Sequence, residues 1–377
     1  MSKIKVNKRS TLVHKEKSII RKVAITSGKL MIAGLFTLGI FCIYLDAKVR
    51  KTFEGQRWQV PVQVYGQLQI LQLGEQANLE EIVQTLKINN YQKVKFVTRA
   101  GQFAQSAEHL NIFQRAFDFT DGSNNPQQLS IEVVSDIIVA LTMDKQQVAQ
   151  IILEPQLLAR LVPDNKEDRI LVSLEELPSQ LIDTLLLIED RDFYHHHGVS
   201  PVGIFRALFN NIRAGRTVQG GSTLTQQLAK NMFLSRERTL SRKIKEALMA
   251  VILELRYSKD QLLEAYINEV YLGQNYANGV FGFGLAAQFY FGKEINELSH
   301  GQIALLIAQV KGPSYYDPWR HPKRAIERRD LILRLMFEQH MLSLAEFEQA
   351  AESKLSVRAH RRLAKKKYPN YLQLVNA

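Results

Sequence analysis

The chain has 377 residues, of which 46% are hydrophobic and 23% charged. This length suits two domains of ~150 residues each, and the composition excludes wholesale disorder and a collagen-like repeat. The single cysteine, Cys42, excludes an intramolecular disulfide and a cysteine-based zinc finger.

The net charge of +12 is concentrated at the two ends of the chain. Residues 1–22 contain eight lysines and arginines against Glu16, and residues 354–367 contain seven with no acidic residue. The rest of the chain therefore has a net charge of −2. Because a nucleic-acid-binding domain has a basic face on the folded domain itself, we expect no nucleic-acid partner.

An apolar segment follows the basic tail at 1–22. Between Lys22 and Asp46 the only charge is Lys29, and the stretch LMIAGLFTLGIFCIYL with the residues before it can span ~30 Å of hydrocarbon. We predict a transmembrane anchor at 23–49 rather than a cleaved signal peptide, because the basic tail is long and no small-x-small site follows. The positive-inside rule then puts the tail in the cytoplasm and the chain after ~50 across the membrane.

Residues 58–150 predict a small α+β domain. WQVPVQVYG alternates, with Val60, Val62 and Val64 on one face, and Gly66 begins a turn into LQILQL, which indicates a hairpin. Asn78 is the expected N-cap of a helix over NLEEIVQTLK, and further strands are expected in KVKFVTR and LSIEVVSDIIVALTM. No catalytic cluster occurs here, so a binding or spacer role is preferred.

From 157 to 350 the pattern is mostly helical. Two capping boxes, Ser258 with Gln261 and Ser299 with Gln302, precede apolar periodic runs that we expect to end at Gly273 and at Gly312-Pro313. One helix places four apolar residues on a single stripe, which are Ile244, Leu248, Val251 and Leu255. The missing GxGxxG motif argues against a Rossmann domain.

Several residues in this part could serve chemistry, and each has a simpler explanation. Glu189-Asp190 follows the apolar run LIDTLLLI, where a carboxylate can have a raised pKa and act as a general acid or base, or be an ordinary solvated helix end. GGST before LTQQLAKN could present N–H groups to a phosphate or merely cap a helix. Arg242 and Glu246 could form a surface ion pair, and Lys311 could complement a helix dipole.

The order and the amino-acid sequences of these segments, taken together, indicate a protein family more specifically than any one segment does. EDRDFYHHHG, GGSTLTQQLAKN, RKIKE, LLEAYINEVYLG and ERRDLIL resemble, in order and spacing, the five motifs of the family-51 peptidoglycan glycosyltransferases, over roughly 175–340. The 58–150 unit resembles the regulatory domain of class A penicillin-binding proteins of the 1B type. The resemblance implies a multidomain chain: a transmembrane helix, a small α+β regulatory domain and a mostly α, lysozyme-like glycosyltransferase domain.

The resemblance also implies an activity and a location. The expected reaction is polymerisation of lipid II into glycan strands, by inverting transfer with release of undecaprenyl pyrophosphate. The expected location is the bacterial inner membrane, with the catalytic domain in the periplasm. Expected partners are lipid II, the growing strand, an outer-membrane lipoprotein activator and proteins of cell division and elongation.

Roles for individual residues follow from the same resemblance. Glu189 becomes the general base, and Glu246 a second catalytic carboxylate that orients cations or holds Mg²⁺ or Mn²⁺; no organic cofactor is expected. The cations expected at phosphates are Lys230, Arg242, Lys243 and Lys311. The other positions assigned to substrate binding are Asp190, Phe193, His196, Thr223, Gln226, Gln227, Asn231 and Asn268.

One departure from the bifunctional relatives is large. The SxxK match lies in the tail, at Ser2-Lys3-Ile4-Lys5, and no KTG occurs, so no transpeptidase activity is expected. Residues 351–377 are then a basic tail or the start of a linker to a missing transpeptidase domain. Truncation and natural monofunctionality both stay open.

Two other functions compete with the glycosyltransferase. A lytic transglycosylase or hydrolase of peptidoglycan would use one carboxylate as an acid, and a non-enzymatic envelope scaffold would bind through the small domain. A lipid substrate would also explain an apolar run at i, i+3, i+4, i+7 as an interfacial helix, although core packing explains it equally well; its residues are Phe205, Leu208, Phe209 and Ile212.

Overall fold

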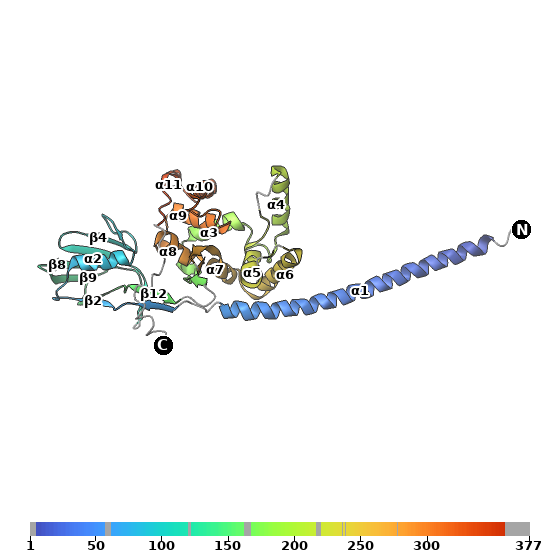
Figure 1. Ribbon diagram of the computed structural model, residues 1–377, viewed down its shortest axis with the longest axis horizontal. Coiled ribbons are helices and arrows are strands. Elements are labelled where there is room, and N and C mark those ends of the chain that lie inside the picture. The colour runs from blue at the N-terminus through green and yellow to red at the C-terminus, as the bar shows by residue number, and fades with distance from the viewer. Residues whose placement is uncertain are drawn as a thin grey trace.

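The computed structural model describes residues 5–56, 62–119, 122–161, 167–215, 220–235, 237, 239–276 and 278–358. Figure 1 shows a long helix, α1, that leaves a body made of a small mixed domain and a larger helical domain. Most of the predicted segment 351–377, including KYPNYLQLV, lies outside the described residues.

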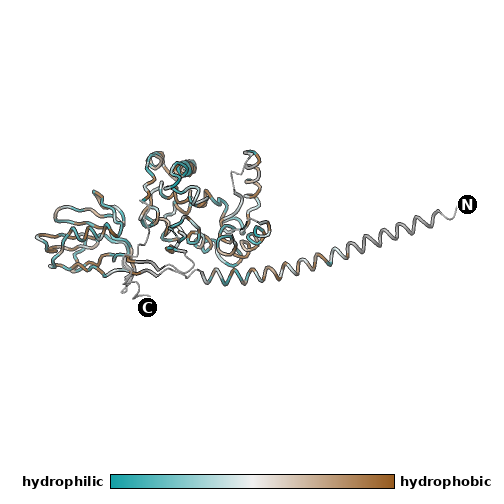
Figure 2. The backbone as a smooth tube through the Cα atoms, in the orientation of Figure 1, coloured by the Kyte–Doolittle hydropathy of each residue, from teal (hydrophilic) through white to brown (hydrophobic). Residues whose placement is uncertain are grey.

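Helix α1 (Lys5–Gln56) serves both as an anchor candidate and as part of the helical domain. Its stretch Ile25–Gly55 is long and apolar enough to cross a membrane, and its hydropathy can be followed in Figure 2. The helix continues past residue 49, however, and Leu45, Val49 and Phe53 are 2%, 0% and 0% exposed in the core of the helical domain. The end of the predicted anchor therefore packs against protein, because these residues recur every four positions on one face.

The small domain is built on a six-stranded sheet in the order β10-β9-β8-β5-β4-β3. The strands are β3 (Gln92–Lys93), β4 (Gln102–Gln105), β5 (His109–Gln114), β8 (Gln127–Val134), β9 (Ile137–Met143) and β10 (Gln146–Gln147). Helix α2 (Leu79–Ile88) buries Ile82, Val83 and Leu86 in the core of this domain. Asn78 caps α2 as predicted, since its side chain accepts a hydrogen bond from the N–H of Glu80 at 2.9 Å.

The predicted hairpin around Gly66 is wrong. Strand β1 (Val62–Tyr65) pairs with β12 (Leu157–Leu161), and β2 (Gln69–Gln72) pairs with β11 (Gln150–Leu153), so both partners come from the far end of the small domain. The N–H of Gly66 donates to the carbonyl of Gln156 at 2.8 Å and holds this arrangement. Period-two alternation predicts a strand and its buried face but says nothing of its partner.

Two other strand predictions need correction. In KVKFVTR only Lys93 belongs to a strand. LSIEVVSDIIVALTM forms two strands, β8 and β9, joined at Ser135 and Asp136, whose φ angles of 54° and 61° suit the two-residue turn of a twisted hairpin. A further short pair is formed by β6 (Phe117–Phe119) and β7 (Gly122–Asn124).

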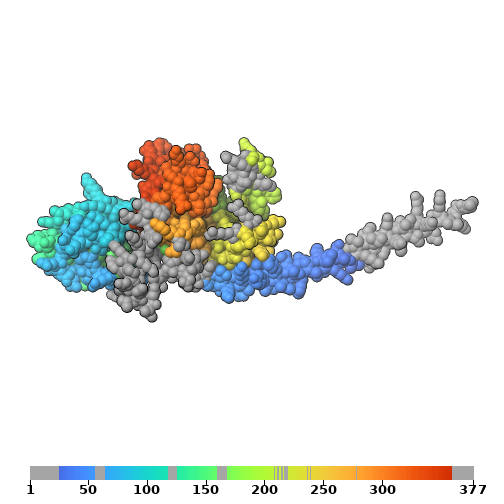
Figure 3. Space-filling view, viewed as in Figure 1, coloured from blue at the N-terminus to red at the C-terminus, as the bar shows by residue number. Residues whose placement is uncertain are grey.

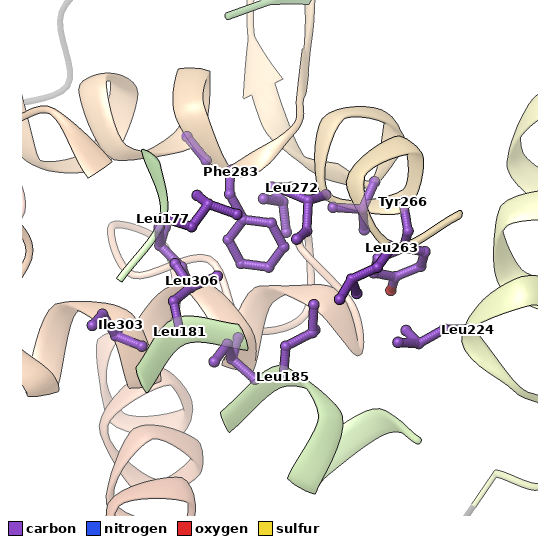
Figure 4. Close-up of a cluster of buried hydrophobic side chains, with 14 of the residues drawn as sticks. Leu177, Leu181, Leu185, Leu224, Leu263, Tyr266, Leu272, Phe283, Ile303 and Leu306 are labelled. Carbon is purple, nitrogen blue, oxygen red and sulfur yellow. The ribbon is translucent and has the colours of Figure 1, made fainter. Parts of the chain in front are cut away.

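The helical domain surrounds a single apolar core. Its helices are α3 (Ser179–Glu189), α4 (Pro201–Ala214), α5 (Leu224–Phe233), α6 (Leu240–Arg256), α7 (Lys259–Glu269), α8 (Phe283–Phe291), α9 (His300–Val310), α10 (Pro322–Glu338) and α11 (Leu344–Glu352), with short helices η1 (Leu174–Glu176) and η2 (Ile295–Glu297). Figure 4 shows Leu181 and Leu185 of α3 and Leu306 of α9 gathered around Phe283 of α8.

A small sheet completes this domain and corrects two expectations. It consists of β13 (Glu167–Arg169), β15 (Asn278–Phe281) and β14 (Tyr271–Asn275). With β12 at Leu157–Leu161, the first described residues after 156 are therefore strands and not helix. Both predicted capping boxes are present. Gly273, however, does not end α7; it lies in β14, where a Cβ would meet the hydroxyl of Tyr290 at 2.6 Å.

A buried ion pair joins the two domains. The Nε of Arg115, from the small domain, lies 2.7 Å from Oε1 of Glu297, and both side chains are almost fully buried. Arg115 also donates to the carbonyl of Asn89 at 2.8 Å, and its guanidinium lies 4.4 Å from the ring centre of Tyr91. Glu297 ends η2, directly before α9.

Candidate active site

Glu189 is the last residue of α3 and lies in a crowded, partly apolar position. Burial raises the pKa of its carboxyl, while a hydrogen bond from Gln227 and the charges of Arg328 and Lys311 oppose that rise. Gln227 donates from Nε2 to Oε2 of Glu189 at 3.0 Å and accepts from the hydroxyl of Tyr266 at 3.1 Å. Gln227 thus fixes the position of Glu189, and Tyr266 fixes the position of Gln227. A carboxylate with a raised pKa and a fixed position suits proton transfer.

Asp190, the next residue, has a different role. Its Oδ2 accepts from the N–H of Leu224 at 2.8 Å and lies 2.9 Å from Nε2 of His196. The Nδ1 of His196 accepts from the N–H of Gly198 at 3.2 Å, which places the ring proton on Nε2. Thr223 donates to the carbonyl of Gly198 at 2.6 Å. These contacts hold the first two motifs together.

Several residues assigned to substrate binding have partners inside the protein, and their contact with substrate stays a prediction. Gln226 completes the capping box of α5 with Thr223. Phe193 is buried beneath Lys259, whose Nζ lies 4.5 Å from the ring centre. Asn268 bonds both backbone groups of Val172, at 3.0 and 2.8 Å. These contacts, like those of Asp190 and His196, hold the backbone around the site in place.

The second carboxylate, Glu246, is enclosed by cations. Arg242 donates from Nη1 to its Oε2 at 2.6 Å, and Lys243 pairs with its Oε1. Lys243 also donates to the hydroxyl of Ser222 at 2.7 Å, which connects the second and third motifs. Arg242 retains a buried Nε without a hydrogen-bond partner among the described residues.

Lys230 extends this cationic group at the surface. Desolvation lowers the pKa of its ammonium, and the neighbouring charges of Arg242 and Lys243 lower it further, while Glu246 opposes them. Asn231 is exposed beside it. Three cations thus share one buried carboxylate, an excess of positive charge that suits an anionic ligand.

A divalent cation does not fit the residues around Glu246. Both of its oxygens are bound by Arg242 and Lys243, whose charges would repel Mg²⁺ or Mn²⁺. Among the residues that the structure describes, no group of three or more His, Cys, Asp or Glu is placed to hold a metal.

A second cationic group lies beside Glu189. Lys311 follows α9 and is exposed, and Arg328 lies on α10, which packs against α9. Both charges act on Glu189. The motif resemblance assigns Lys311 to phosphate binding and gives no role to Arg328, because ERRDLIL contains two adjacent arginines that sequence alone does not distinguish.

Two helices expose apolar side chains to solvent. On α4, Phe205, Phe209 and Ile212 are 71%, 66% and 71% exposed, so core packing is wrong for these three residues; the side chain of Leu208 lies outside the described part. On α6 the predicted apolar stripe faces outward at Ile244 and Leu255, while Glu246 faces inward. Figure 3 shows α4 separated by a hollow from the part formed by α10 and α11.

Comparison with known protein families finds a match for both domains. A family described as transglycosylase matches residues 134–337, and one described as the bifunctional transglycosylase second domain matches residues 71–152. The first match covers more than half of the chain and contains every residue of the candidate active site described above. The chain belongs to the transglycosylase family. The transglycosylase match begins within β8 of the small domain, so the fold places the domain boundary later than the match does.

The full-length relatives share both domains. Penicillin-binding protein 1B of Haemophilus influenzae is 44% identical over 341 residues, that of Vibrio cholerae 45% over 336, and that of Escherichia coli 41% over 349. These matches cover 89%, 89% and 92% of this chain but 43%, 43% and 41% of the relatives. The chain thus spans about two fifths of their length, and the predicted resemblance to the 1B type is confirmed.

The crystal structure of penicillin-binding protein 1A from Haemophilus influenzae superimposes with a TM-score of 0.32 at 20% identity, over 58% of this chain and 22% of that chain. That likeness is too low to bear on the fold of the transglycosylase domain.

Proposed function

We propose that the transglycosylase domain polymerises lipid II into glycan strands. The observation that carries this proposal is Glu189, a carboxylate with a raised pKa, held by Gln227 between two groups of cations. A polymerase of lipid-linked sugars needs a base for the acceptor hydroxyl and positive charge for diphosphate groups.

The reaction is a single inverting displacement. Glu189 takes the proton from the 4-hydroxyl of the acceptor sugar as that oxygen attacks the anomeric carbon of the growing strand. The bond from that carbon to the diphosphate breaks, and undecaprenyl pyrophosphate leaves with the electron pair. Burial favours the protonated product form of Glu189, and the hydrogen bond from Gln227 preserves the charged form that starts the reaction.

The cations would bind the diphosphates. Arg242 offers a planar fork that matches phosphate oxygens, whereas Lys230 and Lys243 act as point charges. Glu246 holds Arg242 and Lys243 in place, since it pairs with both. In this mechanism Glu246 acts as a positioning residue.

A lytic hydrolase of peptidoglycan is the second candidate, and the charge pattern argues against it. Its leaving group is a sugar hydroxyl, which needs a proton and not a cluster of cations. The scaffold hypothesis is weakened by the same residues, because a scaffold has no need of an oriented carboxylate of raised pKa.

We further propose a bacterial inner-membrane location, with the basic tail in the cytoplasm and both domains in the periplasm. The apolar stretch of α1 and the positive-inside rule support this orientation. The exposed apolar residues of α4 and α6 suit contact with a lipid substrate or the membrane surface. The small domain is the proposed contact for an outer-membrane lipoprotein activator and for division or elongation proteins.

The decisive experiment is to incubate the full chain in detergent with labelled lipid II. Polymer supports the proposal; cleavage of preformed strands without reaction of lipid II indicates the hydrolase, and neither reaction indicates the scaffold. Glu189→Gln should lower the polymerisation rate by about 10²–10⁴-fold. The control Glu338→Gln, at the exposed end of α10, should polymerise at the wild-type rate.

The same variant has an expected effect on stability. Because the folded state raises the pKa of Glu189, its ionised form at neutral pH destabilises the fold, and this cost is absent in the amide. Glu189→Gln should therefore melt at the wild-type temperature or above it. A variant that melts normally and still polymerises at the wild-type rate would remove Glu189 from the mechanism.

A further inference from the structure

A cavity of about 390 Å³ opens on the small domain, and none of its lining residues belongs to the candidate active site. This volume falls within the range of ~300–1,000 Å³ found for small-ligand sites. Helix α2 and strands β2 and β12, which border the cavity, are labelled in Figure 1. The residues that line this cavity, called the Glu154 cavity below, include Gln67, Gln69, Thr85, Glu154, Gln156 and Leu158.

The backbone around Glu154 is fixed before any ligand arrives. Asn89, at the end of α2, donates from Nδ2 to the carbonyl of Glu154 at 2.8 Å. The N–H of Gly66 donates to the carbonyl of Gln156 at 2.8 Å. Pro155, between these two carbonyls, is buried and has a restricted φ angle. The wall of the cavity that carries Glu154 is therefore preformed.

The protein satisfies the carboxylate of Glu154 only in part. Its Oε2 accepts from the hydroxyl of Tyr91 at 2.7 Å and lies 3.7 Å from Nη1 of Arg115. Within the described part of the chain, no hydrogen bond reaches Oε1 of Glu154. Arg115 lies closer to Glu297, with its Nε 2.7 Å from Oε1, so one guanidinium serves two carboxylates.

The electrostatics of Glu154 show the same shortage of positive charge. Burial raises the pKa of its carboxyl, and the charges of Glu294 and Glu297 raise that pKa further. The charge of Arg115 and the hydrogen bond from Tyr91 oppose this rise. A ligand cation in the cavity would stabilise the ionised form of Glu154.

The available oxygen favours an ammonium group over other cations. A guanidinium fork needs both carboxylate oxygens, and Tyr91 already occupies Oε2 of Glu154. A metal ion needs several oxygen ligands, and among the residues that the structure describes no group of three or more His, Cys, Asp or Glu is placed to hold one. An ammonium group has three donors, which the free carboxylate oxygen and the amide oxygens of the lining glutamines can accept.

We propose that the Glu154 cavity binds a primary ammonium group on a short methylene chain, as in a lysine side chain or a free small amine. Pro155 and Leu158, which also line the cavity, offer apolar surface to the methylene chain. This inference goes beyond the proposed function, because the cavity lies in the small domain and contains none of the residues assigned to the reaction.

The test is a saturation-transfer NMR titration of the full chain in detergent with Nα-acetyl-lysine N-methylamide. Wild type should bind this probe about tenfold or more tightly than its Nε-acetylated form, which keeps the methylene chain and loses the charge. The matching arginine probe should bind more weakly than the lysine probe, because Oε2 of Glu154 is occupied. Pentylamine distinguishes the two sources: affinity equal to or above that of the lysine probe indicates a free amine, and lower affinity indicates a lysine side chain.

Two variants test the cavity itself. Glu154→Gln should lose about tenfold or more in affinity for the lysine probe, and it should fold, because its amide oxygen can still accept from Tyr91. Thr85→Phe should also weaken binding, since it places a ring in the cavity and leaves Glu154 unchanged. The matched control is Glu108→Gln, which removes an exposed carboxylate from the same domain and should bind like wild type.

Thermal melting gives a second readout. The lysine probe should raise the melting temperature of wild type and leave that of Glu154→Gln unchanged, because a ligand stabilises only the protein that binds it. Equal affinity of wild type and Glu154→Gln for the lysine probe, or of wild type for the charged and acetylated probes, would overturn the inference. An arginine probe that binds as tightly as the lysine probe would overturn the choice of ammonium. These titrations contain no lipid II, so their outcome is separate from that of the proposed function.

Discussion

Glu189 and Asp190 show how far the surroundings of a side chain decide its chemistry. Both are carboxylates at the end of α3, one residue apart. Asp190 accepts from the backbone of α5 and from His196, which hold its position in the scaffold. Within the described part of the chain Glu189 accepts one side-chain hydrogen bond, from Gln227, and burial raises its pKa. Of the two, Glu189 is therefore the better suited to the proposed proton transfer.

Gln227 provides a test at this scale through the pH dependence of the rate. Its hydrogen bond stabilises the ionised form of Glu189, so Gln227→Met should raise the pKa of Glu189 further. Because the base works only when ionised, activity is lost as the pH falls through this pKa, and the acidic limb of the kcat/KM profile should move to higher pH. The profile in Gln339→Met, an exposed control, should not move. An unchanged limb in Gln227→Met would mean that Glu189 does not set it.

At the scale of elements, α1 links an apolar span to the helical domain without a break. Near the C-terminal end of the apolar stretch, charged residues of α1 contact the helical domain. Arg256 of α6 pairs with Asp46, and Lys48 donates to the carbonyl of Phe233, at the end of α5, at 3.1 Å. Helices α5 and α6 also carry the cations around Glu246, which are Lys230, Arg242 and Lys243. The contacts of α1 therefore fix the position of the candidate active site relative to the apolar stretch of α1.

Phe53→Ala should destabilise the helical domain by about 3–5 kcal/mol, because a fully buried aromatic ring leaves a cavity in a packed core. Phe36→Ala is the matched control: it is 71% exposed on the same helix and should change the melting temperature in detergent very little. Thermal melting of both variants checks this. Equal melting would show that the last turns of α1 do not belong to the core.

At the scale of the whole molecule, the ion pair between Arg115 and Glu297 connects the small domain to the start of α9, the helix that Lys311 follows. Glu297 lies just before α9, and Lys311 follows the other end of that helix. The residues of α9 from Gly301 to Gln309 are all buried, so the helix is held firmly along its length. A partner that shifts the small domain would act on Lys311 through this helix, provided it binds one arrangement better than the other.

Arg115→Met should destabilise the chain by about 3–5 kcal/mol, because it leaves Glu297 charged and buried without its partner. The double variant Arg115→Met with Glu297→Met should recover part of this loss, since the charge of Glu297 is gone. Glu154, 3.7 Å from Arg115, keeps only its hydrogen bond from Tyr91 among the described residues. Melting temperatures of the two variants, with the rate of proteolysis between the domains, check the prediction. A single variant as stable as wild type would show that the ion pair does not hold the domains together.

The sequence by itself determined the local structure and the type of chemistry. The caps at Asn78, Ser258 and Ser299 appear where the spacing of polar and apolar residues predicted them, because a capping bond spans only a few residues. The motifs placed Glu189 and Glu246 in the site for a related reason, since each motif is a continuous run of residues.

The tertiary structure alone decided what depends on distant partners. It paired β1 with β12 and β2 with β11, turned the apolar stripe of α6 toward solvent, and bonded Arg329 while leaving Arg328 with a free donor. It also brought Asp190 and His196 within hydrogen-bond distance of each other. Strand pairing, burial and hydrogen-bond satisfaction depend on residues far away in the chain, so they cannot be predicted from a local sequence pattern.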